Sequence, residues 1–202
     1  LEEHLLAGLE PKGVPKGLKG SVQPFSFNNL EQLKNIVSRH KLAAIKMEVE
    51  RSSPPKKGFL EGIRKICDEE NIILIFDECT SGFRETYGGI HKKYNVEPDM
   101  AIFGKALGNG YAITAIIGKR SIMEAAQTSF ISSTFWTERI GPTAALKTLE
   151  IMKKERSWEQ ITKKGLEIRT IWQEIANQNK LEINIYGIRA LSGFSFTSEL
   201  NR

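Results

Sequence analysis

A strand pattern, a helix pattern and a second strand pattern follow one another with short joints near the middle of this chain. The runs at residues 43–47 and 72–76 are short and largely apolar, as in strands buried on both faces. Between the two runs, apolar side chains recur at helical spacing, at Leu60, Ile63, Ile66 and Cys67. This order is the βαβ unit, which joins parallel strands. We therefore expect an α/β domain in which helices cover both faces of a mostly parallel sheet.

Further elements are expected on both sides of this unit. A helix is predicted from Asn29, with Gln32 placed to complete a capping pair. Apolar runs at residues 100–104 and 112–117 predict two more strands, the second of them buried. Glycines at 108 and 110 predict a tight turn between the two strands.

The last third of the chain reads as two helices and the beginning of a second domain. Pro142 is predicted to open a helix, and apolar spacing from Trp158 onward predicts a long amphipathic helix. Short strands are expected at residues 183–186 and 191–196. We place the domain boundary near residue 156, so that 1–156 belong to the large domain. Residues 157–202 then form a connector helix and the start of a small α+β domain.

Two opposite charges stand where buried strands end. Asp77 follows the run 72–76, and Lys105 follows the run 100–104. Ligands of open α/β sheets gather beyond the carboxyl ends of parallel strands, so both charges are placed to act on one ligand. Pyridoxal 5′-phosphate (PLP) requires this pair, because an amine holds its aldehyde as a Schiff base and a carboxylate keeps its ring nitrogen protonated. The pattern suggests a PLP-dependent enzyme.

Three segments extend this chemistry to a known family. Residues 76–84, the dipeptide at 98–99 and residues 104–110 resemble the signature of class III (fold type I) aminotransferases. Within that family the chain is most similar to the glutamate-1-semialdehyde aminomutase-like branch. The resemblance implies a three-layer α/β/α PLP-transferase large domain. It also implies that Lys105 carries the cofactor as a Schiff base and that Asp77 contacts the pyridine nitrogen.

The resemblance also implies two further cofactor contacts and a partner. In residues 133–142, Thr137 matches the threonine that contacts the cofactor phosphate of the neighbouring subunit, which implies a homodimer with a shared active site. Cys79 stands where the family usually has a valine that packs against the cofactor ring. Other departures are Ile140 in place of the glycine of a glycine-asparagine-proline turn, with Gly141 in place of its asparagine, and Val49 in place of the proline after Glu48.

The chain is about half as long as members of this family, so we expect it to be a fragment. It would then lack the loop that cradles the cofactor phosphate and the aromatic residue that stacks on the ring. Whether the amino group passes to a second molecule or returns to the same carbon skeleton is not readable from these residues. The amino donor and acceptor are expected to be small molecules.

Other interpretations stay open at this stage. An Asp-Glu pair after a strand also occurs in the magnesium-binding strand of P-loop NTPases, but no Gly-x-x-x-x-Gly-Lys-Ser/Thr motif accompanies it here. A PLP-fold binding subunit without catalysis is a second alternative, although it would not need both Asp77 and Lys105. Thr137 could instead cap a helix. Glu78 could form hydrogen bonds within the site or neutralise Arg84.

Composition excludes some classes of function. The net charge of +5 is scattered along 202 residues, whereas nucleic-acid binding calls for a basic patch. Two cysteines give neither a disulfide framework nor metal-ligand spacing, so a reducing cytoplasm is expected and no metal site is predicted. The three histidines also lack ligand spacing, which favours surface or packing roles. No membrane span is recognisable.

Overall fold

The chain divides into two compact units, residues 1–42 and 43–202. The computed structural model describes residues 13, 15–18, 20–132, 134–135 and 137–197. The first unit contains a short 3-10 helix, η2 (Lys16–Leu18), and the helix α1 (Leu30–Arg39).

The start of α1 confirms the predicted cap and changes one detail of it. The Asn29 side chain accepts a hydrogen bond from the backbone N–H of Gln32 at 3.0 Å. The Gln32 side chain reaches past the cap and accepts from the backbone N–H of Ser26 at 2.7 Å. Both side chains thus fix the entry of the chain into the helix.

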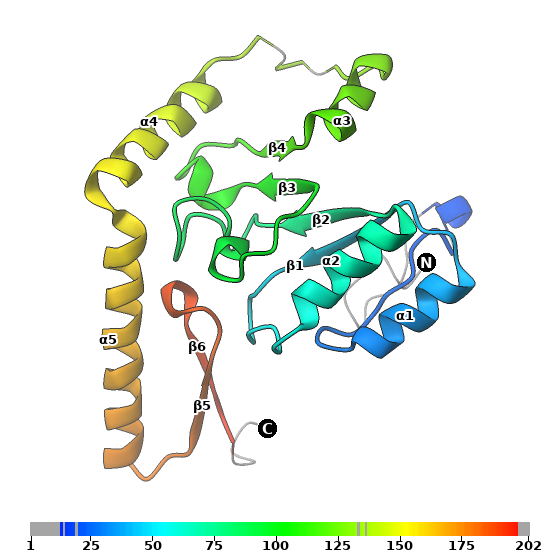
Figure 1. The fold of residues 1–202 in the computed structure, drawn as a ribbon. Coiled ribbons are helices and arrows are strands. Elements are labelled where there is room, and N and C mark those ends of the chain that lie inside the picture. Colours follow the sequence, from blue (N-terminus) through cyan, green and yellow to red (C-terminus); the bar gives the residue numbers. More distant parts are fainter. Residues whose placement is uncertain (1–12, 14, 19, 133, 136, 198–202) are drawn as a thin grey trace. The chain divides into compact units, whose positions relative to one another are not determined.

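The second unit is built on a four-stranded sheet in the order β1-β2-β3-β4 (Figure 1). The strands β1 (Ala44–Glu48), β2 (Ile73–Asp77) and β3 (Met100–Phe103) are parallel, as the βαβ pattern predicts. The fourth strand, β4 (Ala115–Gly118), runs antiparallel to β3. The sheet is therefore mixed but mostly parallel.

One face of this sheet holds the core. Alternate strand residues are buried there, namely Ile45, Met47, Leu74, Phe76, Ala101 and Phe103. The helix α2 (Phe59–Glu70) joins β1 to β2, packs against β2 and buries the apolar side that its sequence spacing predicts (Figure 1). On the opposite face, side chains are more accessible, and Lys46, Ile75 and Asp77 lie there. The crossover thus leaves the predicted carboxylate on the more open face.

The strand predicted at residues 112–117 is shorter and less buried than expected. The turn at Gly108 to Tyr111, closed by a 3.1 Å backbone hydrogen bond, continues into an irregular segment, so that β4 starts only at residue 115. Among the described residues β4 pairs only with β3, and Ile116 and Ile117 are 53% and 56% exposed. An apolar run alone does not distinguish a central strand from such an edge strand.

Two short helices and a long helix pair follow the sheet. The helix α3 (Arg120–Met123) continues into 3-10 turns, and α4 (Ile140–Glu155) comes next. Pro142 is the third residue of α4 and not the first. This place also suits proline, because backbone N–H groups in the first turn have no intrahelical acceptor. Ala145 of α4 joins Ala101 and Phe103 in one buried cluster.

The long helix α5 (Ser157–Gln178) begins directly after α4 ends, and Arg156 turns the chain in a left-handed conformation with φ of 49°. This break lies at the predicted domain boundary, although the division into domains stays a prediction. The strands β5 (Ile183–Tyr186) and β6 (Gly193–Phe196) form a separate antiparallel pair, as two predicted strands anticipate.

A short 3-10 helix, η6 (Arg189–Leu191), connects β5 to β6 and packs against α5. A Cβ atom at Gly165 of α5 would lie 1.8 Å from the carbonyl oxygen of Arg189, so glycine alone permits this approach. Among the described residues, no helix combines the length and apolar character that crossing a membrane requires.

Candidate functional site

Asp77 ends β2 and carries a carboxylate whose two oxygens are both engaged. Its Oδ2 accepts a hydrogen bond from Lys46 Nζ at 2.8 Å, and its Oδ1 accepts from the backbone N–H of Cys79 at 3.1 Å. Burial would raise the pKa of the Asp77 carboxyl, but the bonds from Lys46 and Cys79 outweigh it and the net shift is downward. Asp77 is therefore ionised at neutral pH.

Lys105 follows the end of β3 by two residues and opens the short 3-10 helix η4 (Lys105–Leu107). Its backbone is left-handed, with φ of 40°, and the residue is exposed. The Nζ atom donates a hydrogen bond to the Thr80 hydroxyl at 2.6 Å. A Cβ atom at Gly104 would lie 3.3 Å from Cys79 Sγ, so glycine eases the close passage of the two loops. The amine is thus held at the sheet edge and is open to reagents.

The structure brings Asp77, Cys79 and Lys105 to one edge of the sheet. The strands β2 and β3 are parallel neighbours, and Asp77 is in register with Ile102, three residues before Lys105. Burial raises the pKa of the Cys79 thiol, the negative charge of Asp77 raises it further, and the positive charge of Lys105 acts in the opposite direction. The charges of Asp77 and Lys105 therefore both act on Cys79, in opposite directions.

Thr137 forms no contact with these three residues in the part of the chain that the structure describes. It is an exposed residue in the loop before α4. The side chain that caps the start of α4 is that of Glu138 and not that of Thr137. The Glu138 carboxylate accepts hydrogen bonds from the backbone N–H groups of Ile140 and Gly141, the latter at 3.1 Å. Ser133 and Thr134 are the other hydroxyl residues of the segment 133–142, and Ser133 lies outside the described residues.

Glu78 is fully buried, and its contacts decide between the two roles that the sequence leaves open, hydrogen bonding within the site or neutralising Arg84. Its carboxylate accepts a hydrogen bond from the Ser81 hydroxyl at 2.5 Å and from the backbone N–H of His91 at 3.1 Å. The His91 Nδ1 atom lies 2.9 Å from the same carboxylate. Glu78 therefore fixes the loop behind Asp77 and does not pair with Arg84. His91 is buried, so of the surface or packing roles favoured for the histidines it has the second. Its partner Glu78 is thirteen residues away in the sequence, and no spacing pattern predicts this contact.

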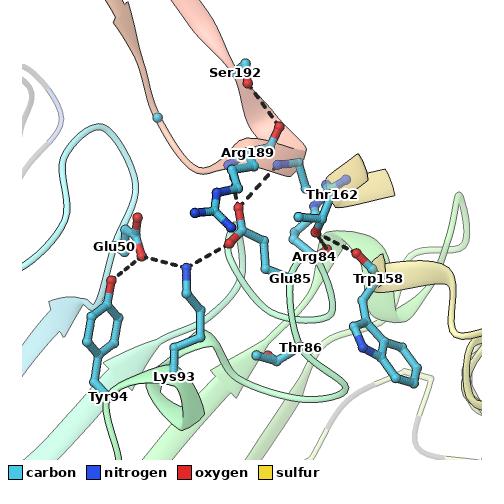
Figure 2. A network of polar contacts seen from close by, with 12 residues as sticks. Glu50, Arg84, Glu85, Thr86, Lys93, Tyr94, Trp158, Thr162, Arg189 and Ser192 are labelled. Atoms are coloured by element: carbon cyan, nitrogen blue, oxygen red, sulfur yellow. Dashed lines mark hydrogen bonds and ion pairs between the residues drawn. The ribbon is translucent and has the colours of Figure 1, made fainter. Parts of the chain in front are cut away.

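A second polar network anchors the same loop further on (Figure 2). Glu85, whose side chain is 4% exposed, accepts from Lys93 Nζ at 2.7 Å and from the backbone N–H groups of Arg189 and Ala190 of η6. Lys93 also donates to Glu50 at 3.3 Å. Figure 2 shows Lys93 between the two carboxylates. The segment after Asp77 is thus tied to the region that follows α5.

A cavity of about 1200 Å³ opens beside Lys105. Its wall includes the loop at 105–111, the first three turns of α4 and the beginning of α5. Arg84 and Arg139 also line it, and no Asp or Glu side chain does. Asp77 and Cys79 are not part of this wall, so the cavity adjoins the amine and not the carboxylate.

The described residues contain no group of three His, Cys, Asp or Glu side chains that could hold a metal ion. The lysine and carboxylate instead form the donor set that PLP needs. An exposed amine can reach an aldehyde, and an ionised carboxylate can hold a protonated ring nitrogen. The geometry therefore fits the cofactor that the sequence predicts.

Comparison with curated proteins gives close relatives. The chain is 35% identical over 187 residues to 3-aminobutyryl-CoA aminotransferase from Cloacimonas acidaminovorans, covering 87% of this chain and 44% of the relative. It is 36% identical over 162 residues to glutamate-1-semialdehyde 2,1-aminomutase from Citrifermentans bemidjiense, covering 76% and 38%. The chain thus spans less than half the length of these relatives.

Solved structures share the fold at lower identity. A transaminase with PLP bound superposes with a TM-score of 0.85 at 22% identity, over 93% of this chain and 46% of that one. An omega-transaminase from Sphaerobacter thermophilus gives a TM-score of 0.82 at 23% identity, over 91% and 44%. The α/β fold is therefore that of the PLP-dependent transferases. The family model Aminotransferase class-III matches residues 19–202, and the chain belongs to the class III aminotransferase family.

Proposed function

We propose that this chain is part of a PLP-dependent enzyme that transfers an amino group. The observation that carries the proposal is the placement of an ionised Asp77 and an accessible Lys105 amine beyond neighbouring parallel strands. Membership of the class III family supports it. No comparison favours the P-loop NTPase interpretation.

The proposed roles follow from the chemistry of each side chain. Bound PLP would supply an electron-withdrawing ring that stabilises negative charge on the substrate carbon. Lys105 would hold the cofactor through Nζ, and its amine, when free, would move a proton to and from the substrate carbon. The Thr80 hydroxyl, 2.6 Å from Nζ, orients the amine. Asp77 would keep the ring nitrogen protonated through its negative charge.

Two further residues complete the proposed cofactor site. Cys79, whose thiol pKa is shifted by the charges of both Asp77 and Lys105, would pack against the ring. Thr137 would reach the phosphate held by a second copy of the chain, so the proposal includes a homodimer with a shared active site. Thr137 is exposed, which is compatible with a contact to another subunit.

The proposed substrates are small amino donors and acceptors. Relatives of the chain are named both as an aminotransferase and as an aminomutase, so both outcomes stay within the proposal. We also propose that residues 157–202 open a smaller domain, as the break between α4 and α5 suggests. A cytoplasmic location is proposed as well, in keeping with two cysteines that are both free thiols.

The visible absorption spectrum of the protein with added PLP tests this function. We expect a band of the covalently held cofactor, and borohydride reduction should fix the label on Lys105 in a peptide map. A label on another lysine would overturn the assignment. A labelled Lys105 without turnover for any amine would instead favour a binding subunit that has lost catalysis.

A further inference from the structure

Lys46 holds a positive charge beside Asp77, the carboxylate that is proposed to contact the cofactor ring. It lies on β1, opposite Ile75 of β2, while Glu48 lies opposite Asp77. Since side chains two residues apart share a face of a strand, Lys46 and Asp77 project from the same face of the sheet. The distance from Lys46 Nζ to Asp77 Oδ2 is 2.8 Å. This face is also the more open one.

Other charges near this pair are engaged elsewhere. Glu48 is in register with Asp77, but its carboxylate lies 3.5 Å from Arg51. Lys105 donates to Thr80. Among the described residues, Lys46 is the cation that forms an ion pair with Asp77. The side chains of Asp77 and Lys46 are 23% and 56% exposed, so water reaches the ammonium group and screens part of the attraction between them.

A carboxylate that already holds an ammonium group offers less negative charge to a second cation. A pyridinium N–H bound to Asp77 would stand close to the Lys46 ammonium, and two positive charges at such short range repel each other. The repulsion acts on the protonated ring and not on a ring that carries no charge at this position. Its effect is therefore specific to the ring nitrogen.

We propose that Lys46 is a positioning residue that acts through Asp77 and limits how strongly this carboxylate favours the protonated ring nitrogen of PLP. The inference rests on the proposed function. It assigns to Lys46 control over the electron-withdrawing strength of the cofactor, since protonation of the ring sets that strength. Lys46 itself does not touch the reacting atoms.

The test compares PLP with an analogue that carries a C–H group in place of the ring nitrogen. Dissociation constants of both are measured for the wild-type protein and for Lys46→Met, which keeps the length of the side chain and removes its charge. We expect the preference for PLP over the analogue to rise about tenfold in Lys46→Met, as for a change of about one pKa unit at the ring nitrogen. The ¹⁵N chemical shift of labelled PLP should move toward the protonated form.

Matched variants separate this effect from a general change of charge. Lys46→Arg keeps the cation and should retain the wild-type preference. Lys65→Met removes a cation from the outer face of α2, where the side chain is 74% exposed, and should leave the preference unchanged. Using a ratio of two ligands cancels effects on the phosphate and on the covalent bond, which the ligands share.

Each outcome bears on one of the two proposals. If PLP labels Lys105 but its preference over the analogue is the same in Lys46→Met and wild type, the role of Lys46 is refuted and the function stands. If PLP does not label Lys105 in the wild-type protein, the proposed function is refuted, and the role of Lys46 is refuted with it. A preference that rises in Lys46→Met and is unchanged in Lys46→Arg supports the inference.

Discussion

Replacement of Glu85 by glutamine should destabilise the protein measurably, although Glu85 lies outside the proposed reaction chemistry. The carboxylate is 4% exposed and accepts from Lys93 at 2.7 Å and from two backbone N–H groups of η6. Glutamine keeps the shape but brings one acceptor oxygen and an NH₂ group. Either Lys93 or the N–H group of Arg189 would then face a donor.

The expected loss follows from the type of contact that is removed. Hydrogen bonds to charged groups contribute about 1.5–3 kcal/mol. Lys93 is 32% exposed and keeps Glu50 as a second acceptor, which lowers the loss on that side. We therefore expect Glu85→Gln to reduce the free energy of unfolding by about 2 kcal/mol, or Tm by roughly 4–8 °C for a domain of this size.

The stability difference between wild type and Glu85→Gln should depend on pH, because the Glu85 carboxylate acts through its negative charge. Burial alone would raise the pKa of Glu85, but Lys93 and the η6 backbone lower it below the ordinary 4.5. A carboxylate with a lowered pKa in the folded state stabilises the fold above its unfolded pKa, and this contribution is lost as pH falls through the folded pKa. The difference between wild type and Glu85→Gln should thus be full at pH 7 and shrink below about pH 4.5.

Urea unfolding of the two proteins at pH 7 and at a series of acidic pH values measures this difference. Glu69→Gln is a suitable control, because the Glu69 side chain is 60% exposed and lies 3.7 Å from Lys65 on α2. Equal stability of wild type and Glu85→Gln at pH 7 would refute the argument. A difference that persists unchanged in acid would show that ionisation of Glu85 is not its source.

Other substitutions test the site and the packing. Lys105→Ala should abolish covalent PLP binding and turnover in the full-length protein, as borohydride labelling and an activity assay would show; full activity would disprove the assignment. Asp77→Ala should still hold PLP on Lys105, but the ring nitrogen would lose the carboxylate that keeps it protonated and the ring would accept electrons less well. Proton transfer should then slow by at least about a hundredfold, comparable to the loss of one acid-base group; an unchanged rate would exclude Asp77. Gly165→Ala should lower stability by about 1–3 kcal/mol, because its Cβ would lie 1.8 Å from the Arg189 carbonyl oxygen; a Tm equal to wild type would contradict this.

Sequence patterns predict those parts of the molecule that depend on local order. Strand ends can be read from apolar runs, so the amino-acid sequence alone is enough to place Asp77 and Lys105 at one edge of a sheet. The helices α2 and α5 likewise follow from apolar spacing, and α4 follows from Pro142 near its start. Exposure of β4 could not be read in this way, because it depends on which neighbours a strand has and not on its composition.

The contacts that tune the site come from pairs distant in the sequence. Lys46 and Asp77 are 31 residues apart, and Glu85 and Arg189 are 104 apart. No spacing rule connects such residues, since their meeting depends on strand register and on packing of α5. Lys46 reads as an ordinary charged residue in a short strand. Its role becomes a hypothesis only when β1 and β2 are aligned.

The two adjacent acids Asp77 and Glu78 point to opposite faces of the sheet, because side chains alternate between the faces along a strand. Asp77 projects to the open face, while Glu78, whose N–H still bonds to Ile102 at 2.8 Å, turns its carboxylate into the interior beside His91. Insertion or deletion of a single residue in β2 would turn each acid to the opposite face of the sheet. A deletion would bring the longer acid to the position that faces Lys46, and an insertion would bring the shorter acid to the buried position near His91. The number of residues in β2 therefore decides which acid faces the site, and engineered chimaeras should be joined outside this strand.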